Sequence, residues 1–262
     1  MPGLITLTTD FGLRDGYVAA VKGVLLSIAP QAQLVDITHE APPHDLVAAA
    51  FALASAAPFF PVGAVHLVVV DPGVGSERRM LAVRTARACY VAPDNGVLAL
   101  ALRQDRPIEI VALTERRYWR AGEISHTFHG RDIMGPVAAH LANGVPLAAL
   151  GKPASDLLAL VLPAPVETRE GGLAGVVIHV DRFGNLISNI PAGRLPPRAQ
   201  VSLGKMTPQP LRRSYSEVAP GQPLALVGSH GYLEIAVREG SASEALGAGR
   251  GTPVVVAPEH LV

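Results

Sequence analysis

The stretch "AVHLVVVDPGVGSERR", residues 64–79, carries the clearest indication of the fold. Its first seven residues are almost uniformly apolar, as strands are in parallel sheets that are covered on both faces. Asp71 follows the predicted strand 64–70 directly, and a glycine-rich loop then leads to Arg78 and Arg79. In open α/β sheets the ligand crevice lies beyond the carboxyl ends of the strands, so these charged residues indicate a site there.

Strands and helices alternate around this stretch. Residues 4–9 and 33–38 are rich in β-branched side chains and predict strands, whereas the apolar spacing of 17–28 predicts a helix. A further helix is predicted over 45–57, with Asp45 as its N-cap. Later strands are predicted at 81–85, 89–92 and 108–113, and helices at 96–104 and 132–142, the second kinked or delayed by Pro136. The pattern predicts an α/β domain with a mainly parallel sheet over residues 1–165.

The composition changes at residues 151–172, where prolines and a Gly-Gly pair predict a linker. Beyond it, short apolar runs are separated by Gly, Pro and Asn, and one short helix is predicted from the capping-box residues that start at Ser241. The predicted strands are 175–181, 185–190, 201–204, 224–228, 232–237 and 253–257. Residues 166–262 are therefore expected to form a smaller, all-β, barrel-like domain.

The composition argues against several classes of protein. Lys+Arg and Asp+Glu both number 22 in 262 residues, without a basic run, so no nucleic-acid partner is expected and a small ligand is favoured. The single cysteine, Cys89, excludes an internal disulfide framework and multi-cysteine zinc sites. No signal peptide or apolar run of membrane-spanning length is visible. The expectation is a cytoplasmic protein with no membrane partner.

Two acidic residues end predicted strands, Asp10 after 4–9 and Asp71 after 64–70. If those strands are neighbours in the sheet, the two carboxylates point into a common site. The residues alone leave open that each aspartate only caps the turn that follows it.

The segment "SHTFHGRD", residues 125–132, places His126, His129, Arg131 and Asp132 before a predicted helix, and Gly130 lets the backbone approach a ligand. A histidine near a helix start is also common as a cap or surface residue. Elsewhere, the spacing of His39, Glu40 and His44 matches no standard zinc motif, "APDNG" predicts a structural turn, and neither a phosphate-binding loop nor a GxSxG motif occurs.

In the second domain, "VDRFGNLISNI" groups Asp181, Phe183 and Asn185 around a glycine. An aromatic face beside an amide and a carboxylate suits a purine ring. The alternative is a simple hairpin turn with Phe183 in the core. The turn-and-strand segment "GSHGYLEIAV" offers Ser229 and glycine-flanked amides that could hold a carboxylate.

Taken together, six blocks resemble one family, the adenosine-forming S-adenosylmethionine (SAM) hydrolases, also called SAM hydroxide adenosyltransferases, which are relatives of the fluorinases and chlorinases. The blocks occur in family order over nearly the whole chain: "TTDFGLRDGYVAAVKG", "VVVDPGVGSERR", "APDNG", "TFHGRD", "VDRFGNLISN" and "GSHGYLEIAV". The resemblance implies an α/β N-terminal domain, a β-rich C-terminal domain and a homotrimer. It also implies a site between the N-terminal domain of one subunit and the C-terminal domain of the next.

The resemblance also implies roles for individual residues. It selects Arg78 rather than Arg79 for the site, and we expect Arg79 to be a solvated neighbour. The implied water-activating residues are Asp71, Arg78 and His129, the implied ribose contacts are Asp10 and Phe128, the implied adenine contacts are Phe183 and Asn185, and the implied contacts of the methionyl amino and carboxylate groups are Asp181 and Ser229. Departures from the fluorinase pattern favour hydroxide over halide as the nucleophile. Fluorinases carry Tyr, Thr and Ser where this chain has Asp71, Val74 and Gly130. A separate departure, His230 where fluorinases have Arg, concerns recognition of the methionine carboxylate.

The resulting expectation is an enzyme that hydrolyses SAM to adenosine and L-methionine by in-line attack of an activated water at ribose C5′, with no cofactor and no metal. His129 and Asp71 would hold the water and Arg78 would orient Asp71; which of the first two accepts the proton stays open. One alternative is a metal-dependent hydrolase that uses Asp10, Asp71, His39 and His129. Another is a non-catalytic protein that binds adenosine or SAM.

Overall fold

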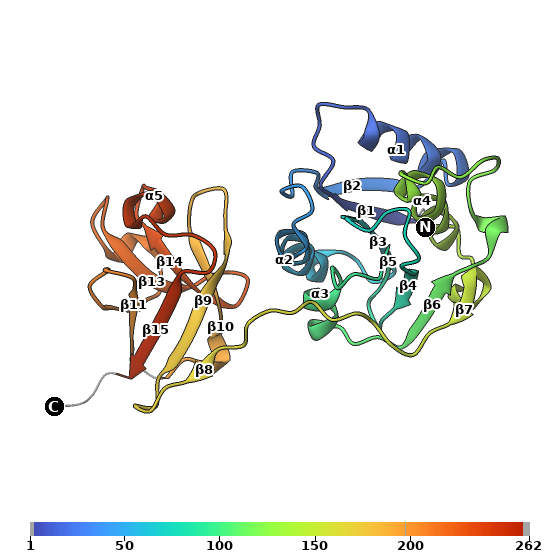
Figure 1. The fold of residues 1–262 in the computed structure, drawn as a ribbon. Coiled ribbons are helices and arrows are strands. Elements are labelled where there is room, and N and C mark those ends of the chain that lie inside the picture. Colours follow the sequence, from blue (N-terminus) through green and yellow to red (C-terminus); the bar gives the residue numbers. More distant parts are fainter. Residues whose placement is uncertain (1–2, 197, 259–262) are drawn as a thin grey trace. The chain divides into compact units, whose positions relative to one another are not determined.

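The computed structural model describes residues 3–196 and 198–258, and the chain divides into two compact units, Met1–Leu160 (unit 1) and Val161–Val262 (unit 2) (Figure 1). Each unit has its own hydrophobic core. The division falls within residues 154–165, which form neither helix nor strand, whereas the sequence pattern placed it after residue 165.

Unit 1 is built on a seven-stranded mixed sheet, which confirms the predicted α/β class. The first four strands in sheet order run parallel to one another, and the remaining three pair antiparallel. In sheet order the strands are β2 (Gln33–Thr38), β1 (Leu4–Thr9), β3 (Ala64–Val69), β5 (Ala88–Pro93), β4 (Met80–Arg84), β6 (Glu109–Leu113) and β7 (Gly151–Pro153).

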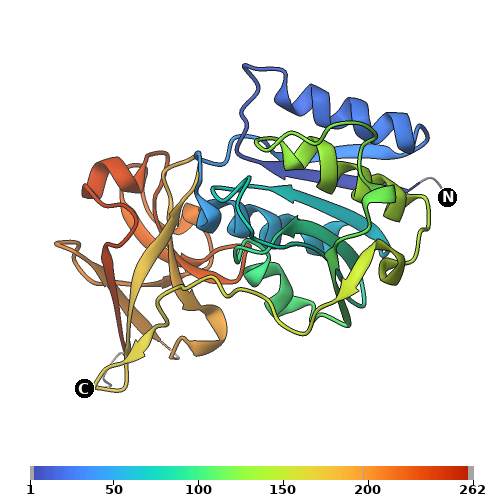
Figure 2. The same ribbon diagram turned by 45° about the vertical axis from the view of Figure 1, so that its right-hand side comes forward.

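Helices cover both faces of this sheet (Figures 1 and 2). On one face, α1 (Tyr17–Ile28) packs against α4 (Gly135–Ala142), and on the other, α2 (Leu46–Ala56) packs against α3 (Ala99–Gln104). With both faces covered, β3 is buried along its whole length, as its apolar sequence predicted.

Two local predictions for these helices are confirmed. The Asp45 side chain caps α2 by accepting a hydrogen bond of 3.0 Å from the backbone N–H of Ala48. Pro136 lies in the first turn of α4, where a missing N–H is tolerated, so the helix begins only at Gly135. A single π-turn, Gly130–Met134, precedes it. The 3₁₀ helices of this unit are Ala57–Phe59, Arg116–Tyr118 and Leu147–Leu150.

Unit 2 is a closed seven-stranded barrel, because β9 pairs with both β15 and β10 and so joins the two ends of the sheet. In order around the barrel the strands are β10 (Leu186–Pro191), β14 (Tyr232–Val237), β13 (Pro223–Val227), β12 (Gln209–Arg212), β11 (Ala199–Leu203), β15 (Pro253–Pro258) and β9 (Leu173–Val180). The two-residue β8 (Val166–Glu167) pairs only with β9. The predicted barrel-like domain is confirmed.

The remaining elements of unit 2 are short. Helix α5 (Ala242–Leu246) starts where predicted, with the Ser241 side chain accepting from the backbone N–H of Glu244 at 3.2 Å. Two 3₁₀ helices, Ala192–Arg194 and Tyr215–Glu217, lie in its loops. None of the described helices is long and apolar enough to cross a membrane.

Candidate active site

The candidate site lies at the carboxyl edge of the parallel strands of unit 1. β1 and β3 are parallel neighbours, with Thr9 at the end of β1 beside Val69 at the end of β3. Asp10 and Asp71, the next polar residues, therefore lie at the same edge of the sheet. The two strands are neighbours, as a common site for both carboxylates requires.

A cavity of about 510 Å³ opens at this edge. This volume is within the usual range for sites that bind small organic molecules. Segments after β1 and β3, the turn before α2 and the approach to the π-turn line it: Asp10, Phe11, Tyr17, Pro43, His44, Val69, Asp71, Val74, Ser125, Thr127, Phe128, His129, Gly130 and Arg131. The sequence analysis did not single out Phe11 or Tyr17, although both stand in the quoted block that contains Asp10.

Arg78 is in direct contact with both Asp71 and His129. Arg78 donates two parallel hydrogen bonds to the Asp71 carboxylate, from Nε to Oδ1 at 2.5 Å and from Nη2 to Oδ2. The same Nη2 lies 3.2 Å from Nδ1 of His129. The Arg78 and Asp71 side chains are 9% and 6% exposed, so this charge-assisted pair is shielded from water.

The contact with Arg78 determines which nitrogen of His129 carries hydrogen. A guanidinium can only donate, so Nδ1 of His129 must accept, and the neutral imidazole then carries its hydrogen on Nε2. Burial and the neighbouring Arg78 charge lower the pKa of His129, while the Asp71 carboxylate opposes them. His129 is therefore a neutral Nε2–H donor at physiological pH.

Arg78 also offers an unused donor. Its Nη1 is buried and has no hydrogen-bond partner in the described part of the chain. A buried donor without a partner is costly, so an oxygen of a ligand or of water at this position would be stabilised.

Glycines explain how the loop after β3 returns Arg78 to Asp71. Gly75 has a φ of +83°, and a Cβ there would lie 2.6 Å from the His126 carbonyl oxygen, so only glycine fits. Within the loop, Ser76 Oγ donates to the Gly73 carbonyl at 2.7 Å and accepts from the backbone N–H of Arg78 at 3.3 Å.

A second group of residues surrounds Asp10. Its Oδ2 accepts a 2.8 Å hydrogen bond from the backbone N–H of His44, whose φ of +66° is unusual for a residue other than glycine. The rings of Phe11, Tyr17 and Phe128 pack together, with centroids 5.4–5.9 Å apart. The cavity thus combines a carboxylate with an aromatic wall, and both Asp10 and Phe128 line it.

The prediction that Arg79 is merely solvated is wrong. Arg79 binds Asp94, which is 4% exposed, through Nε at 2.9 Å and Nη2 at 2.5 Å, and it reaches Asp156 through Nη1 at 2.8 Å. Asp94 Oδ1 also accepts from the backbone N–H of Leu158 at 2.8 Å. Arg79 therefore ties the "APDNG" turn to the segment that leaves unit 1, and that turn is structural, as predicted.

The four predicted contact residues of unit 2 lie on two of its turns. Between β9 and β10, Asp181 Oδ1 accepts from the backbone N–H groups of Phe183 and Asn185 at 2.9 and 2.8 Å, and Oδ2 accepts from Asn185 Nδ2 at 2.9 Å. The hairpin turn is present, but Phe183 is 76% exposed, so the alternative that places this ring in the core is wrong. Ser229 is exposed on the turn between β13 and β14.

Those two turns lie at opposite ends of β14. Leu186 pairs with Ile235, which puts the Asp181–Asn185 turn beside the end of that strand, whereas Ser229 precedes its start.

The residues proposed for a metal-dependent hydrolase do not form a cluster. In the part of the chain that the structure describes, no group of three or more His, Cys, Asp or Glu side chains is arranged to hold a metal ion. His39 is buried and bonds Thr9 Oγ1 through Nδ1 at 2.8 Å, with Nε2 3.0 Å from Asp36. It is engaged with neighbouring strands rather than with Asp71 or His129.

Comparisons with known proteins agree over most of the chain. Two family models match, that of the SAM hydroxide adenosyltransferase N-terminal domain over residues 5–151 and that of the C-terminal domain over 175–255. The chain is 46% identical to the (R)-S-adenosyl-L-methionine hydrolase of Thermus thermophilus, covering 94% of this chain and 96% of that one. It is 29% identical to a fluorinase of Actinoplanes sp., covering 89% and 90%. A solved structure of a protein from Thermotoga maritima superimposes with a TM-score of 0.89 at 36% identity, covering 97% and 99%.

Proposed function

Because the chain belongs to the SAM hydroxide adenosyltransferase family, we infer that it hydrolyses S-adenosyl-L-methionine to adenosine and L-methionine. The observation that carries this inference is the contact of Asp71, Arg78 and His129 beside a cavity of nucleoside size. The names of the similar hydrolases specify the R configuration, and we propose the same configuration for this substrate.

The cavity suits the nucleoside half of SAM. Asp10 is held by the His44 backbone and can accept hydrogen bonds from ribose hydroxyls, while Phe128 and its neighbouring rings pack against the apolar face of the sugar. We propose that Phe183 and Asn185 contact adenine. We also propose that Asp181, whose hydrogen bonds order this turn, contacts the methionyl amino group, and that Ser229 contacts the methionine carboxylate.

The reaction is a single displacement at C5′. A lone pair of the water oxygen forms the new bond to C5′ as the C5′–S bond breaks, and the sulfonium sulfur keeps the electron pair and leaves as the neutral thioether of methionine. The leaving group needs no proton. The protein therefore has two tasks, which are to hold the water in line with the C5′–S bond and to remove one proton from it.

The hydrogen-bond pattern divides these tasks. His129 donates from Nε2 to one lone pair of the water and so fixes its position, because its Nδ1 is already occupied by Arg78. Asp71 accepts the water proton: each carboxylate oxygen that receives a bond from Arg78 retains a further lone pair. Val74 and Gly130 offer no hydroxyl to a halide, and the Asp71 carboxylate repels one, which favours water.

The assembly implied by the resemblance is part of the proposal. In a homotrimer with shared sites, unit 1 of one copy supplies the cavity and unit 2 of the next supplies the exposed Phe183. A cytoplasmic location and a reaction without cofactor or metal are also proposed. Unchanged activity in excess EDTA is the expected result for the last of these.

The test is hydrolysis in water enriched in oxygen-18. Direct displacement at C5′ places the label on the 5′-oxygen of adenosine, and mass spectrometry of the two products reads its position. Tight binding of SAM without any adenosine would instead show a binding protein. Adenosine without label would exclude attack at C5′.

Substitutions at the site give the matching kinetic test. Asp71→Asn removes the proton acceptor and is expected to lower kcat by about 10²–10⁴-fold with a smaller change in KM. Glu109→Gln is the control, because it also removes one carboxylate paired with an arginine, Arg84, on the exposed side of β6. Equal kcat values in the two variants would remove Asp71 from the mechanism.

A further inference from the structure

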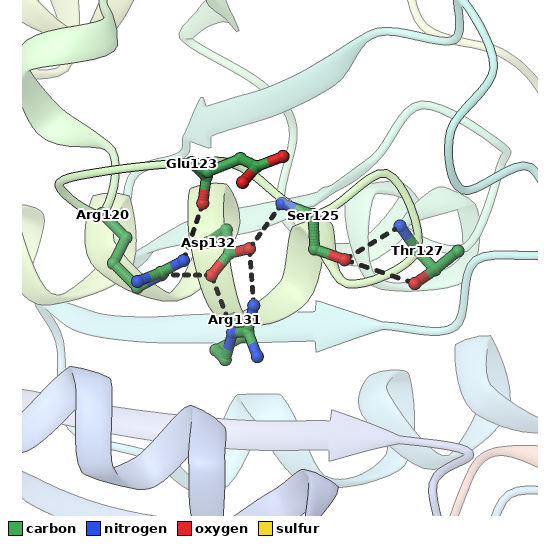
Figure 3. Close-up of polar contacts among 6 residues, drawn as sticks. All are labelled: Arg120, Glu123, Ser125, Thr127, Arg131 and Asp132. Carbon is green, nitrogen blue, oxygen red and sulfur yellow. Dashed lines mark hydrogen bonds and ion pairs between the residues drawn. The ribbon is translucent and has the colours of Figure 1, made fainter.

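The carboxylate of Asp132 is fully buried in unit 1 and is held by four hydrogen bonds (Figure 3). Arg131 donates to it twice, from Nε to Oδ1 at 2.7 Å and from Nη2 to Oδ2 at 2.8 Å. Arg120 donates from Nε to Oδ1 at 2.5 Å, and the backbone N–H of Ser125 donates to Oδ2 at 2.9 Å. Burial raises the pKa of the Asp132 carboxyl, but the Arg131, Ser125 and Arg120 bonds outweigh it and hold the pKa below its usual range.

The same residues connect two stretches of backbone. The N–H of Arg120 donates to the Asp132 carbonyl at 2.9 Å, and its Nη2 donates to the Glu123 carbonyl at 2.7 Å. Asp132 itself lies in the π-turn, where the N–H of Gly135 reaches back to the Gly130 carbonyl. Segment 120–125 is therefore fixed against the π-turn by charged side chains and by backbone bonds.

The connected stretch forms one wall of the candidate active site. Six residues of that wall, Ser125, Thr127, Phe128, His129, Gly130 and Arg131, line the cavity. The Arg131 guanidinium lies 4.9 Å from the centre of the Phe128 ring, so Asp132 acts on that ring through Arg131. π-turns of this kind occur often at functional sites.

We propose that Asp132 is a positioning residue for the reaction: with Arg120 and Arg131 it holds the wall that carries Phe128 and His129 at the distance the displacement needs. The proposal rests on the function inferred above. A fully buried carboxylate is costly unless its charge is paired, and the partly exposed guanidinium groups of Arg120 and Arg131 both pair with this one. Here the arrangement fixes two stretches of backbone in one wall of the active site.

The charge of Asp132 also acts on His129. Burial has the largest effect on the His129 pKa and lowers it. The charges of Arg78 and His126 lower the pKa as well, whereas those of Asp71 and Asp132 raise it. His129 must be neutral to accept from Arg78, so activity is lost as pH falls through its pKa. Removing the Asp132 charge lowers that pKa further, and the acidic limb of the kcat/KM profile then moves to lower pH.

Asp132→Asn tests the proposal, because it keeps the shape of the side chain and removes its charge. We expect kcat/KM to fall at least about tenfold, since small displacements of reacting groups cost that much or more, and the acidic limb to move to lower pH. Glu109→Gln is again the control and should change neither quantity. An Asp132→Asn profile that coincides with this control overturns the proposal.

Arg120→Met is the second variant, in case Asp132→Asn does not fold. It removes the Arg120 bonds to the Asp132 carboxylate and the Glu123 carbonyl but keeps the Asp132–Arg131 pair and its charge. We expect Arg120→Met to lower kcat/KM and to leave the acidic limb of its pH profile where it is in the wild type. A kcat/KM equal to that of the wild type would overturn the proposal.

The wild-type protein separates this test from that of the function. If it forms no adenosine, the inferred function fails, and calorimetric titration of adenosine into the same variants then tests the wall directly. We expect weaker adenosine binding in Arg120→Met than in Glu109→Gln, and equal affinities would overturn the positioning role.

Discussion

At the residue scale, Arg78 and Arg79 show how neighbours of one type acquire different tasks. The chain enters β4 directly after them, and successive side chains of an extended chain point to opposite sides. Arg78 turns to Asp71 and His129, while Arg79 turns to Asp94 and Asp156. One arginine therefore belongs to the proposed active site, and the other holds a turn.

Gly130 leads to a prediction at this scale. A Cβ at this position would lie 2.7 Å from Cγ1 of Val69, a buried residue of β3 whose β-branched side chain is stiff. Gly130→Ala is therefore expected to displace the segment that carries His129, with a loss of about 1–3 kcal/mol of stability and a lower kcat/KM. Urea unfolding and steady-state kinetics measure the two effects.

Gly23→Ala is the matched control. Gly23 is an exposed helical residue of α1, and a Cβ there meets nothing within 4 Å. The substitution is expected to leave kinetics unchanged and to stabilise the protein by about 0.5–1 kcal/mol. If Gly130→Ala behaved like Gly23→Ala, the contact with Val69 would not restrict the site.

At the scale of elements, β3 carries both the site and a buried titratable group. His66 in the middle of β3 is 1% exposed, bonds Thr6 Oγ1 on β1 through Nδ1 at 2.7 Å and stacks on Tyr90 of β5. Burial lowers the pKa of His66 to about 4, opposed by the Asp105 charge. The folded protein therefore keeps this imidazole neutral where the unfolded chain takes up a proton.

This difference predicts a pH-dependent stability. Above about pH 6.5, the neutral state of His66 contributes about 3 kcal/mol to the free energy of unfolding. This contribution is lost as the pH falls toward about 4. Urea unfolding as a function of pH measures it. His66→Gln can still bond Thr6 but does not titrate, so its stability should fall less over the same interval. Parallel curves for the two proteins would contradict the prediction.

Most elements could be predicted because their signals are local. The spacing of apolar residues located α1, and the Asp45 and Ser241 caps located the starts of α2 and α5. The antiparallel arrangement of β4, β6 and β7 has no such signal, because strand order depends on contacts between distant segments. The two-residue β8 and the π-turn were not predicted either.

The site was predictable to a similar degree. Polar residues directly after apolar strands pointed to Asp10 and Asp71, and β1 and β3 do lie side by side. The choice of Arg78 over Arg79 came only from the resemblance, since both follow the same loop. The double pairing of Asp132 could not be foreseen, because Arg120 is twelve residues away and reaches it only through the fold of segment 120–132.

At the scale of the whole molecule, the proposed sharing of sites between copies can be tested by mixing. Asp71→Asn damages unit 1 and Phe183→Ala damages unit 2, so each variant alone should be inactive or weak. If each site joins unit 1 of one copy to unit 2 of another, random mixed trimers contain intact sites, about one quarter of the total. Co-expression followed by an activity assay measures the recovery.

Two controls define the outcome of that experiment. Mixing the same proteins after purification, without exchange of subunits, should give only the average of the separate activities. A chain that carries both substitutions, co-expressed with either single variant, should recover nothing, because an intact unit of one kind is then missing from every copy. No recovery in the main experiment would place all contact residues of a site within one chain.

The closed barrel of unit 2 limits how copies of this chain associate through that unit. Among the described residues, each of its seven strands already has two hydrogen-bonded neighbours, and only the two-residue β8 presents a free backbone edge. Edge-to-edge addition of a foreign strand, a common route to both assembly and aggregation, is therefore restricted to that short segment. Recognition by unit 2 therefore depends on exposed side chains, including those on its turns, where individual substitutions can tune the affinity without disturbing the sheet.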